Sequence, residues 1–228
     1  MSQPVVSPFV VAIDGPAGAG KSTVARALAA RLGYTFLDTG ALYRSVALIA
    51  GRRGIPWDDA GRLGRLASSL DIVFEKDGEG TRVWADGVDV TRAIRTPEIS
   101  EGASQVSALP EVRAGLLDVQ RRVAARSRVV AEGRDIGTVV FPDAQAKFFL
   151  VASPETRARR RTLELAAAGR PAVLADVLAD MLARDARDSG RAVAPLRAAP
   201  DAVEIDTSAL TPEAVTQRML AVVRSRGG

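Results

Sequence analysis

Gly15-Pro16-Ala17-Gly18-Ala19-Gly20-Lys21-Ser22-Thr23 follows the apolar run at 9–13 and leads directly into a helical pattern. The spacing G-x-x-x-x-G-K-S between a strand and a helix is that of a phosphate-binding loop. Its glycines let successive backbone N–H groups point at phosphate oxygens, and the helix N-terminus adds the positive end of its dipole. We expect Lys21 to reach the β- and γ-phosphates and the Ser22 hydroxyl to bind Mg²⁺. The nine residues therefore predict a nucleoside triphosphate site.

The composition excludes several kinds of chemistry. The chain has 228 residues, enough for one large α/β domain, and contains neither cysteine nor histidine. Disulfides, thiolate metal sites and histidine-based acid–base catalysis are therefore excluded. Phosphoryl transfer remains possible, because it depends mainly on positioning and on charge stabilisation. The net charge is +4 without a basic tract that contains interleaved aromatic residues, so we expect no nucleic-acid partner.

The location of the protein follows from what the sequence lacks. Residues 1–8 carry neither the basic region nor the apolar stretch of a secretory signal, and no apolar run approaches membrane-spanning length. A chain without cysteine also fits a reducing compartment. We therefore expect a cytoplasmic protein without a membrane partner.

Strands and helices alternate along most of the chain. After the loop we expect a helix at 21–32, a short strand at 34–38 and a helix at 41–50 that carries Tyr43 and Arg44 in its first turn. Ligands of open α/β sheets gather at the carboxyl ends of the strands, so Asp38, Thr39, Tyr43 and Arg44 should lie on the same rim as the loop. Further strands are expected at 128–132, 146–151 and 203–206, and a closing helix at 212–224.

One region breaks this alternation. Segments 71–75, 81–85 and 88–90 alternate with period two, and turn residues stand at 77–80 and 86–87. They predict a small antiparallel meander inserted into the main fold. A helix should follow from Thr96 to Ala108 with a proline at its first position, and another from Pro110 to about Ala125.

Two further features indicate how a triphosphate would be handled. Glu132 ends an apolar strand, where phosphate-loop proteins often place the carboxylate on the magnesium side, and either Glu132 or Asp38 fits that role. Helices from Ser153 and from Val173 predict a hairpin rich in arginine. We interpret it as a lid that neutralises phosphate charge and excludes water, and the alternative is a solvated face with i,i+4 pairs. Arg157 and Arg161 share one face of the first helix and are the expected nucleotide contacts.

Four more motifs resemble those of bacterial cytidylate kinases. They are D-T-G-A-L-Y-R at 38–44, A-S-Q-V at 103–106, E-G-R-D-I-G-T at 132–138 and R-D-S-G-R-A-V-A-P-L at 187–196. The resemblance extends from about Phe9 to Val223. It implies a P-loop kinase fold with a five-stranded parallel sheet flanked by helices, a small antiparallel insertion and a short helical lid. It implies a single domain, with a core at about 9–57, 109–152 and 192–228, a monophosphate-binding insertion at about 58–108 and a lid at about 154–191.

The same resemblance implies transfer of the γ-phosphoryl group of ATP to CMP or dCMP, with Mg²⁺ as cofactor. Lys21, Arg134 and Arg191 would be catalytic, and a site complete within one chain implies a monomer. An aspartate at the base accepts from the amino group of cytosine, whereas uracil would place a carbonyl against it. Carried over motif by motif, the acceptor residues are Ser104, Arg113 and Asp135 for the base, Arg44, Arg134 and Arg191 for the phosphate, Asp188 for the ribose, and Thr39 and Tyr43 along the pocket.

Two other functions stay open. Another P-loop kinase with a small acceptor, of the adenylate, uridylate or shikimate type, would share the loop and the lid. A nucleotide-dependent switch without an acceptor is the less favoured alternative. The sequence lacks the N-K-x-D string of guanine-specific switches, and a water-directed hydrolase would not need the arginines assigned to the acceptor.

Overall fold

The computed structural model describes residues 8–77, 80–125 and 127–228. Part of the expected turn at 77–80 therefore lies outside the described residues, as do residues 1–7. The chain divides into two compact units, one formed by residues 1–37 and 123–228 and the other by residues 38–122. None of the helices in the described ranges combines the length and the apolar character that crossing a membrane requires.

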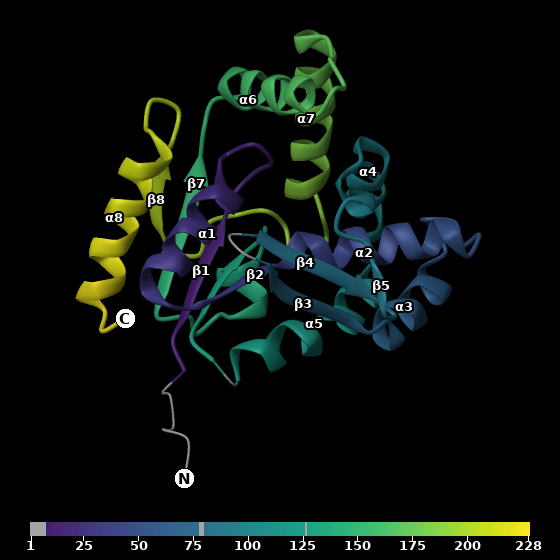
Figure 1. Ribbon diagram of the computed structural model, residues 1–228, viewed down its shortest axis with the longest axis horizontal. Coiled ribbons are helices and arrows are strands. Elements are labelled where there is room, and N and C mark those ends of the chain that lie inside the picture. Colours follow the sequence, from purple (N-terminus) through teal and green to yellow (C-terminus); the bar gives the residue numbers. More distant parts are fainter. Residues whose placement is uncertain (1–7, 78–79, 126) are drawn as a thin grey trace. The chain divides into compact units, whose positions relative to one another are not determined.

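The first unit is built on a parallel sheet with β1 at its centre (Figure 1). β1 pairs in parallel with β6 on one side, where Ile13 lies opposite Glu132, and with β7 on the other, where Ile13 lies opposite Phe148. β7 pairs in parallel with β8. The predicted five-stranded parallel sheet is confirmed. Its order is β2-β6-β1-β7-β8, with β1 at Val10–Asp14, β2 at Thr35–Asp38, β6 at Val129–Glu132, β7 at Ala146–Val151 and β8 at Val203–Asp206.

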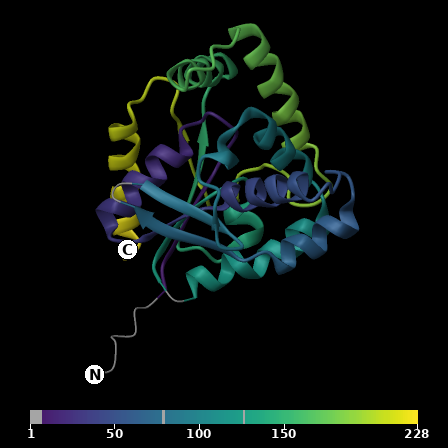
Figure 2. The ribbon, with the colours of Figure 1, turned by 45° about the vertical axis from the view of Figure 1, so that its right-hand side comes forward.

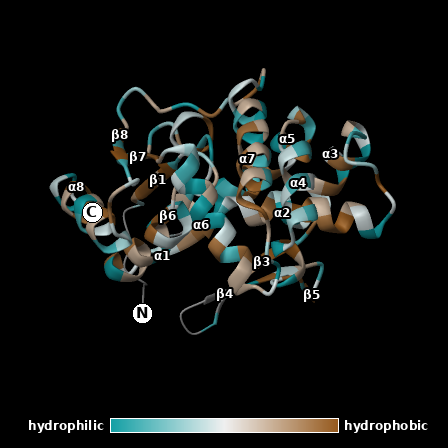
Figure 3. Cartoon of the chain, turned by 90° about the horizontal axis from the view of Figure 1, so that it is seen from above, coloured by the Kyte–Doolittle hydropathy of each residue, from teal (hydrophilic) through white to brown (hydrophobic). Residues whose placement is uncertain are grey.

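Helices α1 (Lys21–Leu32) and α8 (Pro212–Ser225) pack against each other and against this sheet. The core between them contains Val11, Leu28, Phe148 and Met219, all fully buried or nearly so. β1 and β7 carry mostly apolar residues, which are brown in Figure 3. Strands buried on both faces require such continuous apolar runs, which explains why these segments were recognisable in the sequence.

Helices α6 (Pro154–Ala167) and α7 (Leu174–Ser189) form the predicted hairpin, and α7 runs back from the end of α6 in Figure 2. Ala158, Val177 and Met181 form its small apolar core. Ser153 caps α6 by accepting a hydrogen bond from the N–H of Thr156, and Pro154 occupies the first turn. The cap followed by proline is therefore a reliable start signal here.

The second unit contains the predicted antiparallel meander, which is confirmed, with helices packed beside it. Its core includes Leu42, Leu63, Ile94 and Leu116, none of them exposed. The strands are β3 at Ile72–Asp77, β4 at Gly80–Ala85 and β5 at Val88–Asp89. The helices are α2 at Thr39–Arg52, α3 at Ala60–Ser69, the 3₁₀ turn η1 at Ala93–Arg95, α4 at Pro97–Val106 and α5 at Pro110–Ala124, of which the second unit contains all but the last two residues.

The start of α2 differs from the expectation. The helix begins at Thr39 and not at Ala41, because Asp38 is both the last residue of β2 and the N-cap of α2. The Asp38 carboxylate accepts a hydrogen bond from the N–H of Ala41 at 2.9 Å, which allows the helix to begin without an intervening loop. Tyr43 and Arg44 consequently lie two residues farther from the start of α2 than predicted, in its second turn.

Candidate active site

The phosphate loop of the first unit leads from β1 to α1 in the conformation that its glycines permit. Gly18 and Gly20 have φ of 74° and 88°, in the left-handed region that favours glycine. Gly20 is the N-cap of α1 and supplies no side-chain hydrogen bond to the helix. The first N–H groups of α1 thus lack a side-chain cap, and such N–H groups at a helix N-terminus are donors suited to phosphate oxygens.

Neighbouring residues leave no room for a side chain at two glycines of the loop. A Cβ on Gly15 would lie 2.1 Å from the backbone oxygen of Leu150 in β7, so no other residue fits at this point. A Cβ on Gly18 would lie 2.8 Å from Cε of Met181 and 3.0 Å from Cβ of Arg157, both in the α6–α7 hairpin. The loop therefore packs against both the sheet and the hairpin.

Lys21 is almost completely buried at the start of α1. Its Nζ donates a hydrogen bond to the carbonyl oxygen of Pro16 in the same loop at 2.7 Å. Burial lowers the pKa of Lys21 from its ordinary value, and the charge of Arg134 lowers it further. Because these two cations repel each other, an anion bound beside them would be stabilised, as a phosphate site requires.

Asp188 is the anion around which the predicted arginines of the first unit gather. Its side chain is 1% exposed, accepts a hydrogen bond from Nε of Arg134 at 3.0 Å, and pairs with Nη2 of Arg191. Arg184 lies 3.9 Å away in the same cluster and also acts on the pKa of Lys21. Burial by itself would raise the pKa of Asp188, but the charges of Arg134, Arg191 and Arg184 outweigh it and lower that pKa.

Arg134 and Asp135 lie between two attachments to β1. The N–H of Gly133 donates to the carbonyl oxygen of Ile13 at 2.9 Å. The carboxylate of Asp14 then accepts from the N–H groups of Ile136 and Gly137, which open the π-helical turn η2 (Ile136–Val140). Sequence reasoning missed Asp14, although the signal existed: an acidic residue at the end of an apolar strand, immediately before the glycine loop.

The two predicted lid arginines have different surroundings. The Arg157 side chain is 4% exposed, donates to the carbonyl oxygens of Ala152 and Ala17, and pairs with Asp185 of α7 at 2.7 Å. Arg161 is more exposed and pairs with Glu164 of its own helix at 3.2 Å. They share a helix face, but only Arg157 touches the phosphate loop.

Thr207, after β8, is a second residue that the sequence did not reveal. Its hydroxyl lies 3.1 Å from the carbonyl oxygen of Ala19 in the loop, and it accepts a hydrogen bond from Arg160 of α6 at 3.1 Å. The link joins chain segments that are remote in sequence, and a threonine after a strand gives no signal of it. Thr207 thus supports the loop from the side of β8.

In the second unit Arg44 forms an ion pair with Asp38. Nη2 of Arg44 lies 2.8 Å from the Asp38 carboxylate, which also caps α2. Gly40 makes room for this pair, since a Cβ there would lie 2.8 Å from Nη1 of Arg44. Thr39, at the first position of α2, is buried beside them. Arg44 and Thr39, each predicted as a substrate contact, therefore lie in the first two turns of one helix.

The remaining predicted acceptor residues of the second unit meet where α2, α4 and α5 come together. The guanidinium of Arg113 lies 5.7 Å from the centre of the Tyr43 ring, in cation–π geometry. Arg113 also donates to the carbonyl oxygen of Ser107, whose own hydroxyl donates to the carbonyl oxygen of Ser104. Ser104, Arg113 and Tyr43 are all buried, so their positions are fixed by packing and hydrogen bonds.

The described residues contain no group of three or more acidic side chains that could hold a metal ion by itself. Magnesium in kinase sites is commonly held by one or two protein ligands together with substrate phosphates and water. Ser22 in the first turn of α1 is exposed, and its hydroxyl is one oxygen ligand of the kind that Mg²⁺ takes.

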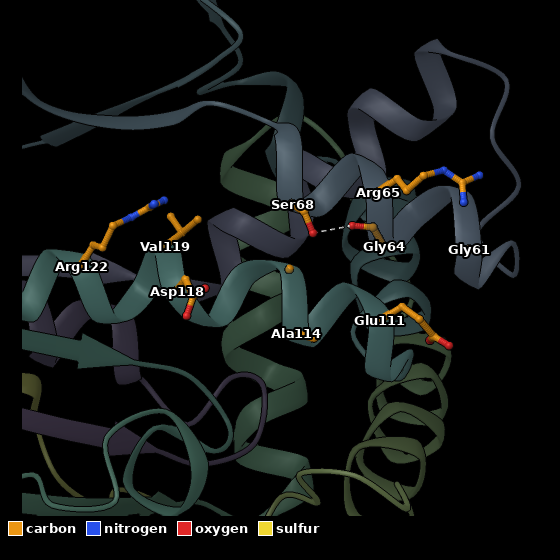
Figure 4. Close-up of a pocket in the computed structure, with 10 residues that line it drawn as sticks. Gly61, Gly64, Arg65, Ser68, Glu111, Ala114, Asp118, Val119 and Arg122 are labelled. Carbon is orange, nitrogen blue, oxygen red and sulfur yellow. Dashed lines mark hydrogen bonds between the residues drawn. The ribbon is translucent and has the colours of Figure 1, made fainter.

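A shallow pocket in the second unit lies between α3 and α5 and involves none of the predicted site residues (Figure 4). The two helices approach closely on glycines: a Cβ on Gly64 would lie 2.7 Å from Cβ of Glu111, and one on Gly115 would lie 2.7 Å from Oγ of Ser68. The hollow is a consequence of this small-residue packing. Its lining residues are Gly61, Gly64, Arg65, Ser68, Glu111, Ala114, Gly115, Asp118, Val119 and Arg122.

Comparison with known proteins identifies the family of this chain. The family model described as cytidylate kinase matches residues 11–225. The chain is 54% identical to the cytidylate kinase of Geobacter sp. (strain M21) over 217 residues, which are 95% of this chain and 93% of that protein. It is also 54% identical to the cytidylate kinase of Geobacter sulfurreducens over 218 residues, covering 96% and 94% of the two chains.

A solved structure of an uncharacterized protein from Eubacterium ventriosum shares the fold, with a TM-score of 0.52 and 12% identity over 95% of this chain and 99% of that chain. At that identity the likeness shows the fold alone. The family match and the two relatives cover almost the whole chain, including every motif on which the predicted site depends. This chain therefore belongs to the cytidylate kinase family of ATP-dependent kinases.

Proposed function

We propose that this protein transfers the γ-phosphoryl group of ATP to CMP or dCMP, and that the residues predicted from the sequence perform the transfer. The observation that carries the proposal is the cluster of Lys21, Arg134, Arg191 and Asp188 in the same unit as an uncapped phosphate loop. A protein that only bound a nucleotide would not need three arginines gathered at one buried aspartate in the unit that carries Lys21.

On the donor side, the backbone of residues 15–20 and the N-terminus of α1 bind the phosphates of ATP. Lys21 exchanges its hydrogen bond to the Pro16 carbonyl for the β- and γ-phosphates. Mg²⁺, with the Ser22 hydroxyl as its protein ligand, would neutralise phosphate charge when it is bound. Glu132 or Asp38 would orient the water molecules around it. Arg157 and Arg161 of the hairpin are the proposed lid contacts to ATP.

On the acceptor side, Arg44, Arg134 and Arg191 bind the monophosphate. Guanidinium forks suit a dianionic phosphate, because each can donate two parallel hydrogen bonds. The attack brings two phosphate groups of like charge together, so fixed cations are needed most at that point. The attacking phosphate oxygen is already ionised, and a chain without histidine can therefore support the reaction.

Recognition of the nucleoside is assigned to the remaining residues. Ser104, Arg113 and Asp135 read the cytosine edge, with the Asp135 carboxylate accepting from the amino group. Asp188 contacts the ribose, and Thr39 and Tyr43 line the pocket. Uracil would place a carbonyl against a carboxylate, which is unfavourable and gives selectivity by repulsion.

The test is a spectrophotometric assay coupled to ADP release, with ATP and either CMP, dCMP, UMP or AMP supplied in parallel. The proposal predicts the highest kcat/KM with CMP or dCMP and little ADP release without an acceptor. Equal or better turnover of AMP or UMP would contradict it, as would ADP release independent of any acceptor.

We also propose that the protein acts as a cytoplasmic monomer without a nucleic-acid partner, because the assigned residues are complete within one chain. Light scattering of the purified protein with and without substrates tests the oligomeric state. Activity that requires a dimer would contradict the proposal.

A further inference from the structure

Asp14 connects the end of β1 to the segment that carries Arg134 and Asp135. Its side chain is buried, with one carboxylate oxygen accepting from the N–H of Ile136 at 2.7 Å and the other from the N–H of Gly137 at 2.7 Å. Gly15, the first glycine of the phosphate loop, follows Asp14 directly. The Asp14 side chain thus joins the start of the phosphate loop to a segment far away in the sequence.

The attachment works together with a backbone contact. The N–H of Gly133 donates to the carbonyl oxygen of Ile13, so β1 holds the segment at Gly133 and again at Ile136 and Gly137. Arg134 and Asp135 are the two residues between these points. Their backbone is therefore fixed relative to β1 on both sides.

A carboxylate is the side chain that suits this position. Two adjacent N–H groups at the start of a helical turn need two acceptors, and only aspartate supplies both at this length. An asparagine would offer one oxygen and would turn an amide donor toward the other N–H. Burial disfavours the charged form of this side chain and raises the pKa of Asp14 to about 7 despite the two backbone hydrogen bonds. Buried groups perturbed in this way concentrate at functional sites.

We propose that Asp14 is a positioning residue for phosphoryl transfer, which holds Arg134 and Asp135 in register with the phosphate loop. The inference rests on the proposed function, since it assigns the acceptor phosphate to Arg134 and the cytosine edge to Asp135. Asp14 itself touches neither substrate. It acts through the backbone of residues 133–137.

The test is Asp14→Asn in the full chain. Loss of one attachment should displace the Arg134 guanidinium slightly. We expect this to lower kcat/KM for CMP by about 100-fold, as small misplacements of catalytic groups do. The ratio of kcat/KM for CMP to that for UMP should fall at the same time, because Asp135 is loosened. ADP affinity, measured by calorimetry, should stay at the wild-type value, because the glycine loop and Lys21 are intact.

Two control variants isolate the effect. Asp143→Asn removes an exposed carboxylate from the same unit and should leave all three readouts unchanged. Met219→Ala opens a cavity in the core below α8 and lowers stability without touching the segment at 133–137. Its kcat/KM and its CMP-to-UMP ratio should stay at wild-type values below the melting temperature. If Asp14→Asn does not fold, Asp14→Ser supplies one small acceptor at the same position and is assayed in its place.

A folded Asp14 variant with wild-type kinetics would overturn the inference. So would a loss that leaves the CMP-to-UMP ratio unchanged and that Met219→Ala reproduces, because the role would then be structural only. If the wild type itself prefers another acceptor, the proposed function fails. The role of Asp14 is then tested separately, by comparing kcat/KM for that acceptor between wild type and Asp14→Asn. A loss in the variant is still expected, since Arg134 would bind the phosphoryl group of that acceptor too.

Discussion

Arg157 in α6 donates a hydrogen bond from Nη1 to the carbonyl oxygen of Ala17 in the phosphate loop, over 3.2 Å. The same guanidinium pairs with Asp185 of α7 at 2.7 Å, and its side chain is only 4% exposed. One cation therefore links the loop with both helices of the hairpin. Through these contacts Arg157 couples the hairpin to the loop, whether or not it also contacts ATP.

Arg157→Ala should lower the free energy of unfolding by about 2–3 kcal/mol, since it leaves the partly buried Asp185 without its partner. The loss is smaller than for a fully buried pair, because the Asp185 side chain remains 21% exposed. KM for ATP should rise as the loop loses its support. Urea denaturation and steady-state kinetics measure the two effects.

Arg161→Ala is the matched control for stability. Its partner Glu164 is mostly exposed, so removing this pair should change the free energy of unfolding by less than about 1 kcal/mol. The double variant Arg157→Ala/Asp185→Ala should be destabilised by less than the sum of the single variants, because the two residues interact. Additive effects would show that Arg157 and Asp185 do not stabilise the contact between α6 and α7.

Lys21→Ala should reduce kcat by about 10²–10³-fold while the fold stays intact, because Lys21 acts on charge that develops during transfer. Its pKa is lowered by burial and then by Arg134, so the charged form already destabilises the folded state at neutral pH. In the pH range between this lowered pKa and the ordinary value of 10.5, the unfolded chain binds more protons than the folded one. Wild-type stability should therefore rise with pH relative to the variant across that range.

Parallel kinetic assays and thermal melts of the two proteins measure these effects. A folded Lys21→Ala protein with wild-type kcat would remove the basis of the phosphate-loop assignment. Arg218→Ala, which removes an exposed cation from α8, is the control and should behave as wild type in both measurements.

The phosphate loop and the capped helices could be predicted because their signals are local. Pro154 and Pro212 follow Ser153 and Thr211, and both caps accept the hydrogen bonds expected of them. The start of α2 could not be placed, because Asp38 serves a strand and a helix at once, and sequence periodicity does not reveal this double role. Local sequence patterns therefore predict the helices and strands themselves better than the residues at which one element passes into the next.

The types of residue in the site could also be predicted, but not their contacts. The motifs pointed to Arg134, Arg191 and Asp188 as substrate ligands, and no spacing rule shows that Asp188 holds both arginines. An acidic residue at the end of β1 could have been singled out, but the partners of Asp14 could not be predicted, since they lie 122 and 123 positions away. Such contacts depend on which strands become neighbours, and that is a property of the whole sheet.

The pH dependence of stability should carry a contribution from Asp14. Burial raises its pKa from 3.8 to about 7, so between these values the folded protein holds a proton that the unfolded chain has lost. The contribution is fully present below the unfolded pKa and is lost as pH rises through the folded pKa. Since one pKa unit corresponds to about 1.4 kcal/mol, the free energy of unfolding should change by about 4 kcal/mol at most between these two pH values.

Urea denaturation of wild type and Asp14→Asn at about pH 5 and about pH 6.5 measures this contribution. The wild type should lose stability relative to the variant as pH rises, because asparagine does not titrate. A difference in stability that stays constant between the two pH values would show that the pKa of Asp14 is not raised.

Asp188→Asn keeps the shape of the side chain but removes the charge that holds Arg134 and Arg191. The arginines would then repel each other and Arg184, so kcat/KM should fall for CMP and dCMP alike, by about tenfold or more. If Asp188 also accepts from the ribose 2′-hydroxyl, CMP should lose about a further tenfold, the value of one hydrogen bond to a charged group. Initial rates with both acceptors separate the two roles. An equal loss for CMP and dCMP would remove the ribose assignment and leave the arginine-holding role, whereas unchanged rates for both would contradict each of them.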